Sequence, residues 1–182
     1  MPSPTGKRRA VRSATMSNLE NSSVKRVRAA LAELGATAEV IELSGTARSA
    51  QDAADSIGTE LGSIVKTLVF SVSGQAVVAL VAGDRRCDTK ILPALLGLQG
   101  GCKQADADLV REATGFAIGG VAPVAHEHHL PIAIDASLER FEILYAAAGH
   151  PYCVFATSLA ELERLTGGII NADISEPITK GT

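Results

Sequence analysis

Hydrophobic residues recur along this chain with two different periods, and the two periods alternate from end to end. Apolar positions three and four residues apart are typical of amphipathic helices, and short β-branched runs bounded by Gly or Ser are typical of strands. Capping residues and glycines set the expected helix ends. The predicted helices cover residues 22–34, 49–57, 88–96, 106–114 and 158–166. The predicted strands cover residues 39–43, 64–72, 76–82, 132–135, 142–147, 152–156 and 169–172.

The first predicted helix is amphipathic, with Ser22 or Ser23 as its N-cap and Gly35 at its end. One face carries its apolar residues, Val24, Val27, Leu31 and Leu34. Ser49 and Asp52 have the spacing of a capping box for the second helix.

The order of the elements indicates the fold class. Residues 64–72 and 76–82 are joined by Ser73-Gly74-Gln75, which is a hairpin signal. Short strands interleaved with short helices, some of them joined by hairpins, predict a mixed α/β fold in which helices pack against a mixed sheet. The length of 182 residues fits one domain. The sequence has neither a Rossmann fingerprint nor a P-loop.

Composition adds two constraints. Hydrophobic residues make up 46% of the chain, but aromatic residues only 3% and there is no Trp, so Ala, Val, Leu and Ile must fill the core. The apolar runs are of strand length, and none approaches the roughly 18 residues of a membrane span.

The first seventeen residues differ from the rest. They carry Lys7, Arg8, Arg9 and Arg12 without an acid, and they lack the apolar segment of a secretory signal. We expect residues 1–17 to be a disordered tail and residues 18–182 to be the domain; a basic arm along a phosphate backbone is the alternative. Because the chain carries −3 and the tail +4, residues 18–182 carry −7. Such an acidic body argues against general nucleic-acid binding, so any contact with RNA must be local.

The cysteines and histidines do not have the spacing of a metal site. Cys87, Cys102 and Cys153 are scattered, which favours a reducing cytosol and thiols that act as small hydrophobes. In the run 126–129 (His-Glu-His-His), adjacent imidazoles do not converge easily on one ion. We therefore expect no metal and no cofactor.

Lys66 is the first candidate for chemistry. It lies within the apolar strand 64–70, which is expected to be covered on both faces, so its ammonium would have to reach a cavity or an anion. The alternative is a lysine at the start of the strand whose ammonium stays near water. The pattern alone leaves both open.

The loop Gly119-Gly120-Val121-Ala122-Pro123 is the second candidate. Glycines allow the backbone to come close to a ligand, and free N–H groups there would bind a carbonyl oxygen as it becomes negative. Gly120→Val is expected to block this approach, since a β-branched residue resists positive φ. A plain tight turn is the alternative.

Three other polar positions are candidates with structural alternatives. Asp135 ends an apolar strand, where it would orient water or a substrate amine, or cap the turn that follows. His150, beside Gly149, would position a water or be a solvated loop residue. Arg85 lies in a charged run before Asp88, the expected cap of the third helix, and would meet phosphates or line a solvated face.

Taken together, these residues resemble the YbaK family, the free-standing relatives of the prolyl-tRNA synthetase editing domain. The likeness covers about residues 22–174. It rests on segments 64–70 with Lys66, 81–90, 114–123, 135–138 and 162–166, which occur in the family's order.

The resemblance implies a single compact domain with a mixed, mostly antiparallel curved sheet surrounded by short helices. It also implies an aminoacyl-tRNA deacylase, a hydrolase that removes a small amino acid from a mischarged tRNA such as tRNA-Pro. Lys66 matches the family's essential lysine, whose ammonium would hold the terminal adenosine or its phosphate. Gly119–Pro123 matches the family's GxxxP loop, whose amides would face the ester carbonyl, and Asp135 matches a polar pocket position.

The resemblance leaves the rest of the mechanism open. The proton acceptor would be His150, the vicinal hydroxyl of the tRNA or a group on the amino acid. Expected partners are the aminoacylated 3′ end of tRNA and an aminoacyl-tRNA synthetase, with a cytoplasmic location, no membrane contact, and a monomer or homodimer. A non-catalytic module that binds aminoacyl-adenosine and regulates a synthetase is the competing hypothesis.

Overall fold

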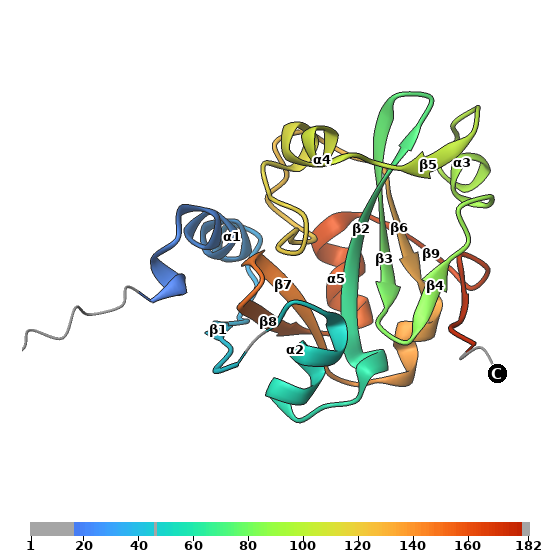
Figure 1. Cartoon of the computed structure of the whole chain (residues 1–182). Coiled ribbons are helices and arrows are strands. Elements are labelled where there is room, and N and C mark those ends of the chain that lie inside the picture. The colour runs from blue at the N-terminus through green and yellow to red at the C-terminus, as the bar shows by residue number, and fades with distance from the viewer. Residues whose placement is uncertain (1–16, 46, 180–182) are drawn as a thin grey trace, which may run out of the picture.

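The protein is described by a computed structural model for residues 17–45 and 47–179, in which short helices surround a central sheet (Figure 1). The helices are α1 (Ser22–Glu33), α2 (Ala50–Ile57), α3 (Leu92–Leu95), α4 (Ala107–Thr114) and α5 (Leu159–Thr166). The strands are β1 (Val40–Glu42), β2 (Ile64–Val72), β3 (Gln75–Ala82), β4 (Arg85–Cys87), β5 (Cys102–Gln104), β6 (Ile132–Asp135), β7 (Leu144–His150), β8 (Cys153–Thr157), β9 (Ile169–Asn171) and β10 (Ser175–Pro177). The short 3₁₀ turns are η1 (Asn18–Glu20), η2 (Leu61–Ser63) and η3 (Ala136–Arg140).

The main sheet has the order β1-β8-β7-β2-β3-β6-β9, and β5 pairs with β2 outside this path. The pairs β2–β7, β3–β6 and β6–β9 are parallel and the other pairs of this sheet are antiparallel. A separate antiparallel pair joins β4 to β10. The predicted fold class, a single mixed α/β domain with a mixed sheet and short helices around it, is confirmed.

Three apolar clusters hold these elements together. The largest lies on the side of the sheet covered by α1, α4 and α5, and includes Val27, Val110 and Leu162. A second cluster packs α3 against the other side of β2 and β3, and a third packs α2 against the start of β2 and the middle of β8. Small aliphatic residues dominate all three, as the composition predicts.

Most predicted elements are present within one or two residues, but the third helix was wrong. The segment predicted as a helix from Asp88 begins as a turn, in which the Asp88 side chain accepts from the Lys90 amide at 3.1 Å, and α3 starts only at Leu92. Pro93 explains the late start, because a proline lacks the N–H of the helical ladder and fits only in a first turn. The three-residue strands β4, β5 and β10 were not predicted, since so short a run shows no period.

The first helix also begins and ends differently from the prediction. Asn21, not Ser22 or Ser23, is its N-cap, because the Asn21 side chain accepts from the Ser23 amide at 2.9 Å. Leu34 is the C-cap and is 40% exposed, so it does not share the buried face of Val24, Val27 and Leu31.

The predicted tail lies almost entirely outside the described residues, which begin at Ser17. Ser17 caps η1, and its hydroxyl donates to the Glu42 carboxylate at 2.5 Å, which ties the start of the body to β1.

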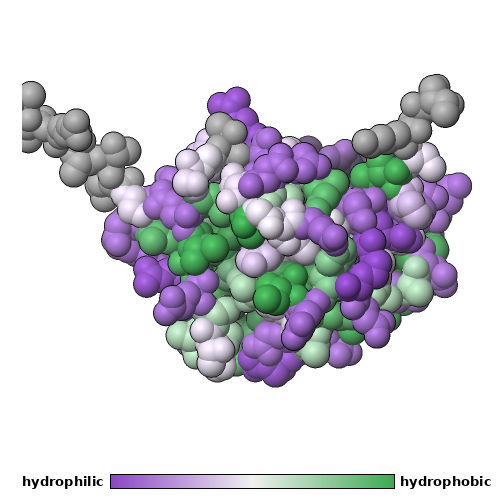
Figure 2. Space-filling model, turned by 90° about the horizontal axis from the view of Figure 1, so that it is seen from below, coloured by the Kyte–Doolittle hydropathy of each residue, from purple (hydrophilic) through white to green (hydrophobic). Residues whose placement is uncertain are grey.

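Seen from below, apolar residues reach the surface in separate areas between hydrophilic ones (Figure 2). None of the helices in the described ranges is long and apolar enough to cross a membrane.

Candidate functional site

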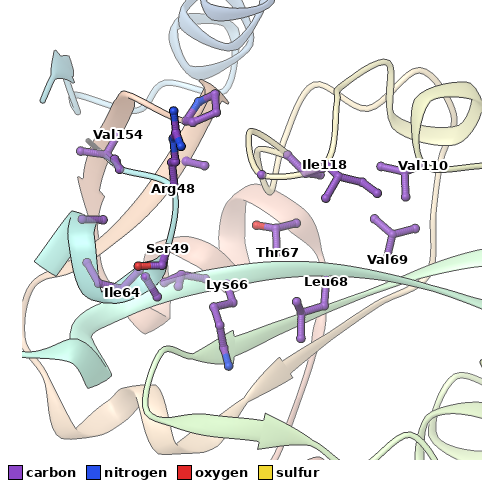
Figure 3. A pocket seen from close by; sticks show the side chains of 18 of the residues that line it. Arg48, Ser49, Ile64, Lys66, Thr67, Leu68, Val69, Val110, Ile118 and Val154 are labelled. Carbon is purple, nitrogen blue, oxygen red and sulfur yellow. The ribbon is translucent and has the colours of Figure 1, made fainter. Parts of the chain in front are cut away.

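A cavity of about 350 Å³ opens beside the middle of β2 (Figure 3). Its walls come from the start of α2, the loop after α4, the end of β5 and the β7–β8 hairpin. Aliphatic side chains form most of the wall, among them Ala53, Ile64, Val69, Val110, Val121, Ala147 and Val154. The polar residues that line it are Arg48, Ser49, Lys66, Thr67, Gln104 and Tyr145.

The predicted loop borders this cavity through Gly119 and Val121. Gly119 has φ +92°, a conformation that side chains rarely adopt, so positive φ falls on Gly119 and not on Gly120 as the sequence suggested. Gly120 is needed for a different reason: a Cβ there would lie 3.1 Å from the His150 Cα and 3.2 Å from its backbone nitrogen. The two glycines thus allow one sharp turn and one close backbone contact.

The amides of this loop differ in whether they already have a hydrogen-bond partner. The Gly120 N–H donates to the Ala117 carbonyl at 3.1 Å and is therefore used within the loop. The amides of Gly119 and Val121 have no hydrogen-bond partner among residues 17–45 and 47–179. These two N–H groups, on residues that line the cavity, are the ones available to a carbonyl oxygen.

His126 holds the far end of the loop. Its Nε2 lies 2.7 Å from the Ala122 carbonyl oxygen, and its ring packs edge-on against Phe116 with ring centres 6.3 Å apart. Arg26 of α1 stacks on Phe116, with its guanidinium carbon 4.3 Å from the centre of the ring, and donates to the Thr114 carbonyl at 3.0 Å. Burial lowers the pKa of His126, which keeps the imidazole neutral and able to donate one hydrogen bond.

Neighbouring residues of β2 point in opposite directions. Thr67 and Val69 point toward the side of Ile118 and Val110, whereas Lys66 points away from it (Figure 3). The Lys66 ammonium donates to the Arg85 carbonyl, and burial lowers the pKa of this lysine. Lys66 therefore borders the cavity, but in this conformation its ammonium is bound on the other side of β2.

Arg85 and Asp135 belong to that other side and do not line the cavity. Arg85 donates to the hydroxyl and carbonyl oxygens of Ser175 at 2.7 and 2.9 Å, which fastens β10 to β4. The Asp135 side chain is fully buried and accepts from the amides of Ala82 at 3.1 Å and Ser137 at 2.9 Å. The capping role considered for Asp135 is thus present in the structure.

His150 lies behind the loop and is half-buried. Its Nδ1 accepts from the Tyr152 amide at 3.1 Å, so in the neutral ring the proton is on Nε2. In this tautomer the one acceptor nitrogen, Nδ1, is occupied by the Tyr152 amide and Nε2 carries the proton, which does not suit a general base. Gly149, with φ +91°, lets β7 bulge against α1, because a Cβ there would lie 2.8 Å from the Ser23 carbonyl oxygen.

The remaining histidines lie on the surface, and two of the cysteines lie in buried or half-buried surroundings. His128 and His129 are exposed, and no three His, Cys, Asp or Glu side chains gather as a metal site within the described ranges. Burial raises the pKa of the Cys87 thiol to about 12 and that of Cys153 to about 11, so both remain protonated and unreactive at neutral pH.

The structure therefore separates the predicted site residues into two groups. Those that border the cavity are Lys66, Gly119 and Val121. Those that do not are Arg85, Gly120, Ala122, Pro123, Asp135, Gly149 and His150. Two polar residues that line the cavity, Arg48 and Thr67, were not among the candidates from the sequence. Strand alternation was the available signal for Thr67, because the neighbour of Lys66 must face the other way.

The chain is similar to several known proteins. Residues 44–165 match the family described as the aminoacyl-tRNA editing domain. The uncharacterized protein YwhH of Bacillus subtilis (strain 168) is 32% identical over 128 residues, which are 70% of this chain and 80% of YwhH. The proline–tRNA ligase of Desulfotalea psychrophila (strain LSv54 / DSM 12343) is 35% identical over 122 residues, which are 67% of this chain but only 20% of the ligase.

A solved structure shares the whole fold. It is the crystal structure of a protein proposed to be a trans-editing enzyme for prolyl-tRNA synthetase, and it superposes with a TM-score of 0.77 at 40% sequence identity. The superposition covers 82% of this chain and 95% of that one. Because the family match spans more than half of the chain and contains β2, the cavity loop and the β7–β8 hairpin, this chain belongs to the aminoacyl-tRNA editing domain family.

Proposed function

We propose that this protein is a trans-editing hydrolase that removes a small amino acid from mischarged tRNA-Pro or a related tRNA. The observation that carries the proposal is the pair of amides, those of Gly119 and Val121, that have no partner in the described part of the chain and belong to residues bordering an aliphatic cavity. The family membership, the ligase relative and the structural neighbour named for prolyl-tRNA synthetase support the same substrate class.

The reaction is the attack of water on the ester that joins the amino acid to the terminal ribose. The carbonyl oxygen becomes negative in the tetrahedral intermediate, and the amides of Gly119 and Val121 stabilise that charge. Loss of one such donor typically slows a reaction by about 10²–10³-fold. The bond from the acyl carbon to the ribose oxygen then breaks, which leaves a free amino acid and a tRNA with a free hydroxyl.

The proton of the attacking water goes to the tRNA itself in this proposal. His150 donates from Nε2 in its described tautomer, and the cavity is lined by no carboxylate among the described residues. The vicinal ribose hydroxyl lies next to the ester whichever amino acid is attached, unlike a group on the amino-acid side chain. It takes up the proton of the water while giving its own proton to the leaving ribose oxygen, so both oxygens end as neutral hydroxyls. Positioning of the ester in the cavity supplies the rest of the acceleration.

The cavity walls favour a small side chain. Val69, Val110 and Val121, three branched residues, form part of these walls. One methylene group discriminates by only about 10- to 200-fold in binding, so an editing site gains selectivity by excluding larger amino acids.

Two cationic side chains, those of Arg48 and Lys66, are proposed to bind the 3′ end of the tRNA. Arg48 is exposed beside the cavity, and its guanidinium has no ion pair or hydrogen bond with a described residue. The family resemblance assigns the terminal adenosine or its phosphate to Lys66, whose ammonium would have to leave the Arg85 carbonyl to reach the cavity.

The test is deacylation of tRNA-Pro and tRNA-Cys charged with Cys, Ala, Ser, Thr or Pro, with wild type and Lys66→Ala side by side. We expect wild type to remove at least one amino acid and Lys66→Ala to be at least about tenfold slower, since about 1.4 kcal/mol of lost contact gives that factor. Unfolding in urea shows whether the variant remains folded. Binding of an aminoacyl-adenosine analogue without loss of any ester would contradict the hydrolase and establish a binding module instead.

A further inference from the structure

The middle of β2 has an open edge on the cavity side. On its other edge β2 pairs with β3 along almost its whole length, from Val65 to Val72. On the cavity side it pairs with β7 only at Ile64 and Val65, and with β5 only from Phe70 onward. Residues 66–69 therefore have no strand beside them where they border the cavity.

Thr67 is the residue that turns its polar groups toward this open edge. The Ile64 carbonyl accepts from the Gly83 amide, which directs the backbone groups of residues 64, 66 and 68 toward β3. The backbone groups of Thr67 point the opposite way, as the neighbouring bond from the Ala105 amide to the Val69 carbonyl confirms. The N–H and C=O of Thr67 are thus available at the edge of the cavity.

The Thr67 side chain adds a third polar group. It points toward the same side as Val69, and its hydroxyl is buried without a hydrogen-bond partner among residues 17–45 and 47–179 (Figure 3). A buried polar atom without a partner is unfavourable, so such atoms are expected to meet a ligand or water. The charged residues that line the cavity, Arg48 and Lys66, are both cations, so a positive ligand group would have to be bound by neutral acceptors.

We propose that Thr67 is the substrate-binding residue that recognises the α-ammonium group of the aminoacyl ester, through its hydroxyl and its own carbonyl oxygen. The inference rests on the proposed hydrolase function and names the contact that function requires. An ammonium group donates three hydrogen bonds and accepts none, so it matches two oxygen acceptors on one residue. Recognition of this group distinguishes an aminoacyl end from an uncharged tRNA or an ester of another acid.

The experiment compares Thr67→Val with Thr157→Val. Valine keeps the shape of threonine and removes only the hydroxyl. Thr157 is the matched control, because its hydroxyl is also buried without a partner among the described residues but lies on β8 away from the cavity lining. Both variants are expected to keep or slightly raise the melting temperature, since each removes an unpartnered buried hydroxyl.

Activity is expected to separate the two variants. On alanyl-tRNA-Pro, or on the fastest ester of the panel above, Thr67→Val should lower kcat/KM by about 10- to 100-fold, the loss expected for a hydrogen bond to a charged group. Thr157→Val should stay within about twofold of wild type, the scatter expected for a change outside the site.

A second substrate identifies the group that Thr67 binds. The lactyl ester of the same tRNA carries a hydroxyl in place of the ammonium; for another amino acid, the corresponding 2-hydroxyacyl ester serves. Because a neutral hydrogen bond is weaker, the ratio of wild-type to Thr67→Val activity should fall to about threefold on this ester.

Each other outcome overturns the inference. If Thr67→Val matches wild type on the aminoacyl ester, or loses the same factor on both esters, the hydroxyl does not bind the ammonium, although the hydrolase function stands. Equal losses in Thr67→Val and Thr157→Val would indicate general repacking. If wild type cleaves no ester of the panel, the proposed function fails and the role of Thr67 fails with it.

Discussion

The cavity and the charged corner on the opposite side of β2 differ in how their polar groups are used. The charged corner consists of Lys66, Asp84, Arg85, Asp135 and Arg140. Each of these side chains binds another part of the protein: Arg140, for example, donates two hydrogen bonds to Asp84 at 2.8 and 2.7 Å, which lowers the pKa of that carboxyl. The cavity carries less charge, yet the Gly119 and Val121 amides and the Thr67 hydroxyl on its lining residues are unpartnered among the described residues.

If the cavity is the binding site proposed above, this difference identifies the feature that marks it. A charged run in a sequence attracts attention, but a charge that is paired and hydrogen-bonded within the fold has little left for a ligand. An unpaired N–H or O–H dipole beside an aliphatic wall attracts a ligand strongly, because little water and few other polar groups are present to screen the attraction. The two regions therefore predict different results when one side chain in each is changed.

The largest effect is expected from Gly120→Val. The new Cβ would lie 3.1 Å from the His150 Cα, so the loop must move away from the β7–β8 hairpin. The Cβ alone requires a shift of a few tenths of an ångström, and the two methyl groups of valine enlarge it. Since a displacement of about 1 Å in a positioning element can cost 10²-fold in rate, we expect kcat for deacylation to fall by about 10- to 100-fold.

Gly101→Val is the matched control for this prediction. Gly101 lies beside β5, has no positive φ, and a Cβ there meets nothing within 4 Å. Its deacylation rate should stay within about twofold of wild type, as is usual for surface changes. Equal rates for Gly120→Val and wild type would remove the loop from the mechanism.

A smaller effect is expected from Arg48→Ala beside the cavity. If Arg48 contacts a phosphate of the 3′ end, its loss should raise KM about tenfold and leave kcat nearly unchanged. The dependence of log KM on log salt concentration should become shallower by about 0.7, the value for one phosphate contact on a single strand.

Arg86→Ala is the comparison from the other side of the molecule. Arg86 is exposed too, but it forms an ion pair with Glu176, so its charge is already paired within the protein. Its removal should change neither KM nor the salt dependence. If both arginine variants weaken binding equally, the tRNA is attracted by overall charge and the contact is not specific to the cavity.

The sequence predicted the frame of this molecule better than its site. Helix caps such as Ser49, Asp106 and Ser158 are local contacts, and all three side chains accept from the amide expected three residues later. The cavity depends on strand pairing, which is not local: Thr67 borders it because β7 leaves β2 at Val65 and β5 joins only at Phe70. No pattern within residues 64–72 contains that information.

The same limit explains why charge was a poor guide to the site. Lys66 and Thr67 are adjacent, and a sequence marks the lysine as unusual in an apolar strand. Strand alternation puts their side chains on opposite sides, but only the fold shows which side meets the cavity and that the Lys66 ammonium meets the Arg85 carbonyl. Where a partner comes from a distant segment, residue type predicts the chemistry of a group but not whether that group is free.

The smallest effect is expected from His126→Gln, which probes the support of the cavity loop. Neutral His126 contacts the Ala122 carbonyl, and burial lowers its pKa below the ordinary value of 6.5. Since the unfolded chain binds a proton at higher pH than the folded one, the stability due to this residue is present above pH 6.5 and is lost as the pH falls below it. Arg26 nearby acts in the same direction, because its charge disfavours the imidazolium.

Glutamine tests this account because its amide N–H still donates but does not titrate. The free energy of unfolding, measured in urea at pH 7.5 and pH 5.5, should fall less between the two values for His126→Gln than for wild type. Deacylation at pH 7.5 should remain within about threefold of wild type if the bond to Ala122 is kept, given the modest net energy of one hydrogen bond. If the two proteins lose equal stability on acidification, protonation of His126 does not loosen the loop, and the acid sensitivity belongs to other groups.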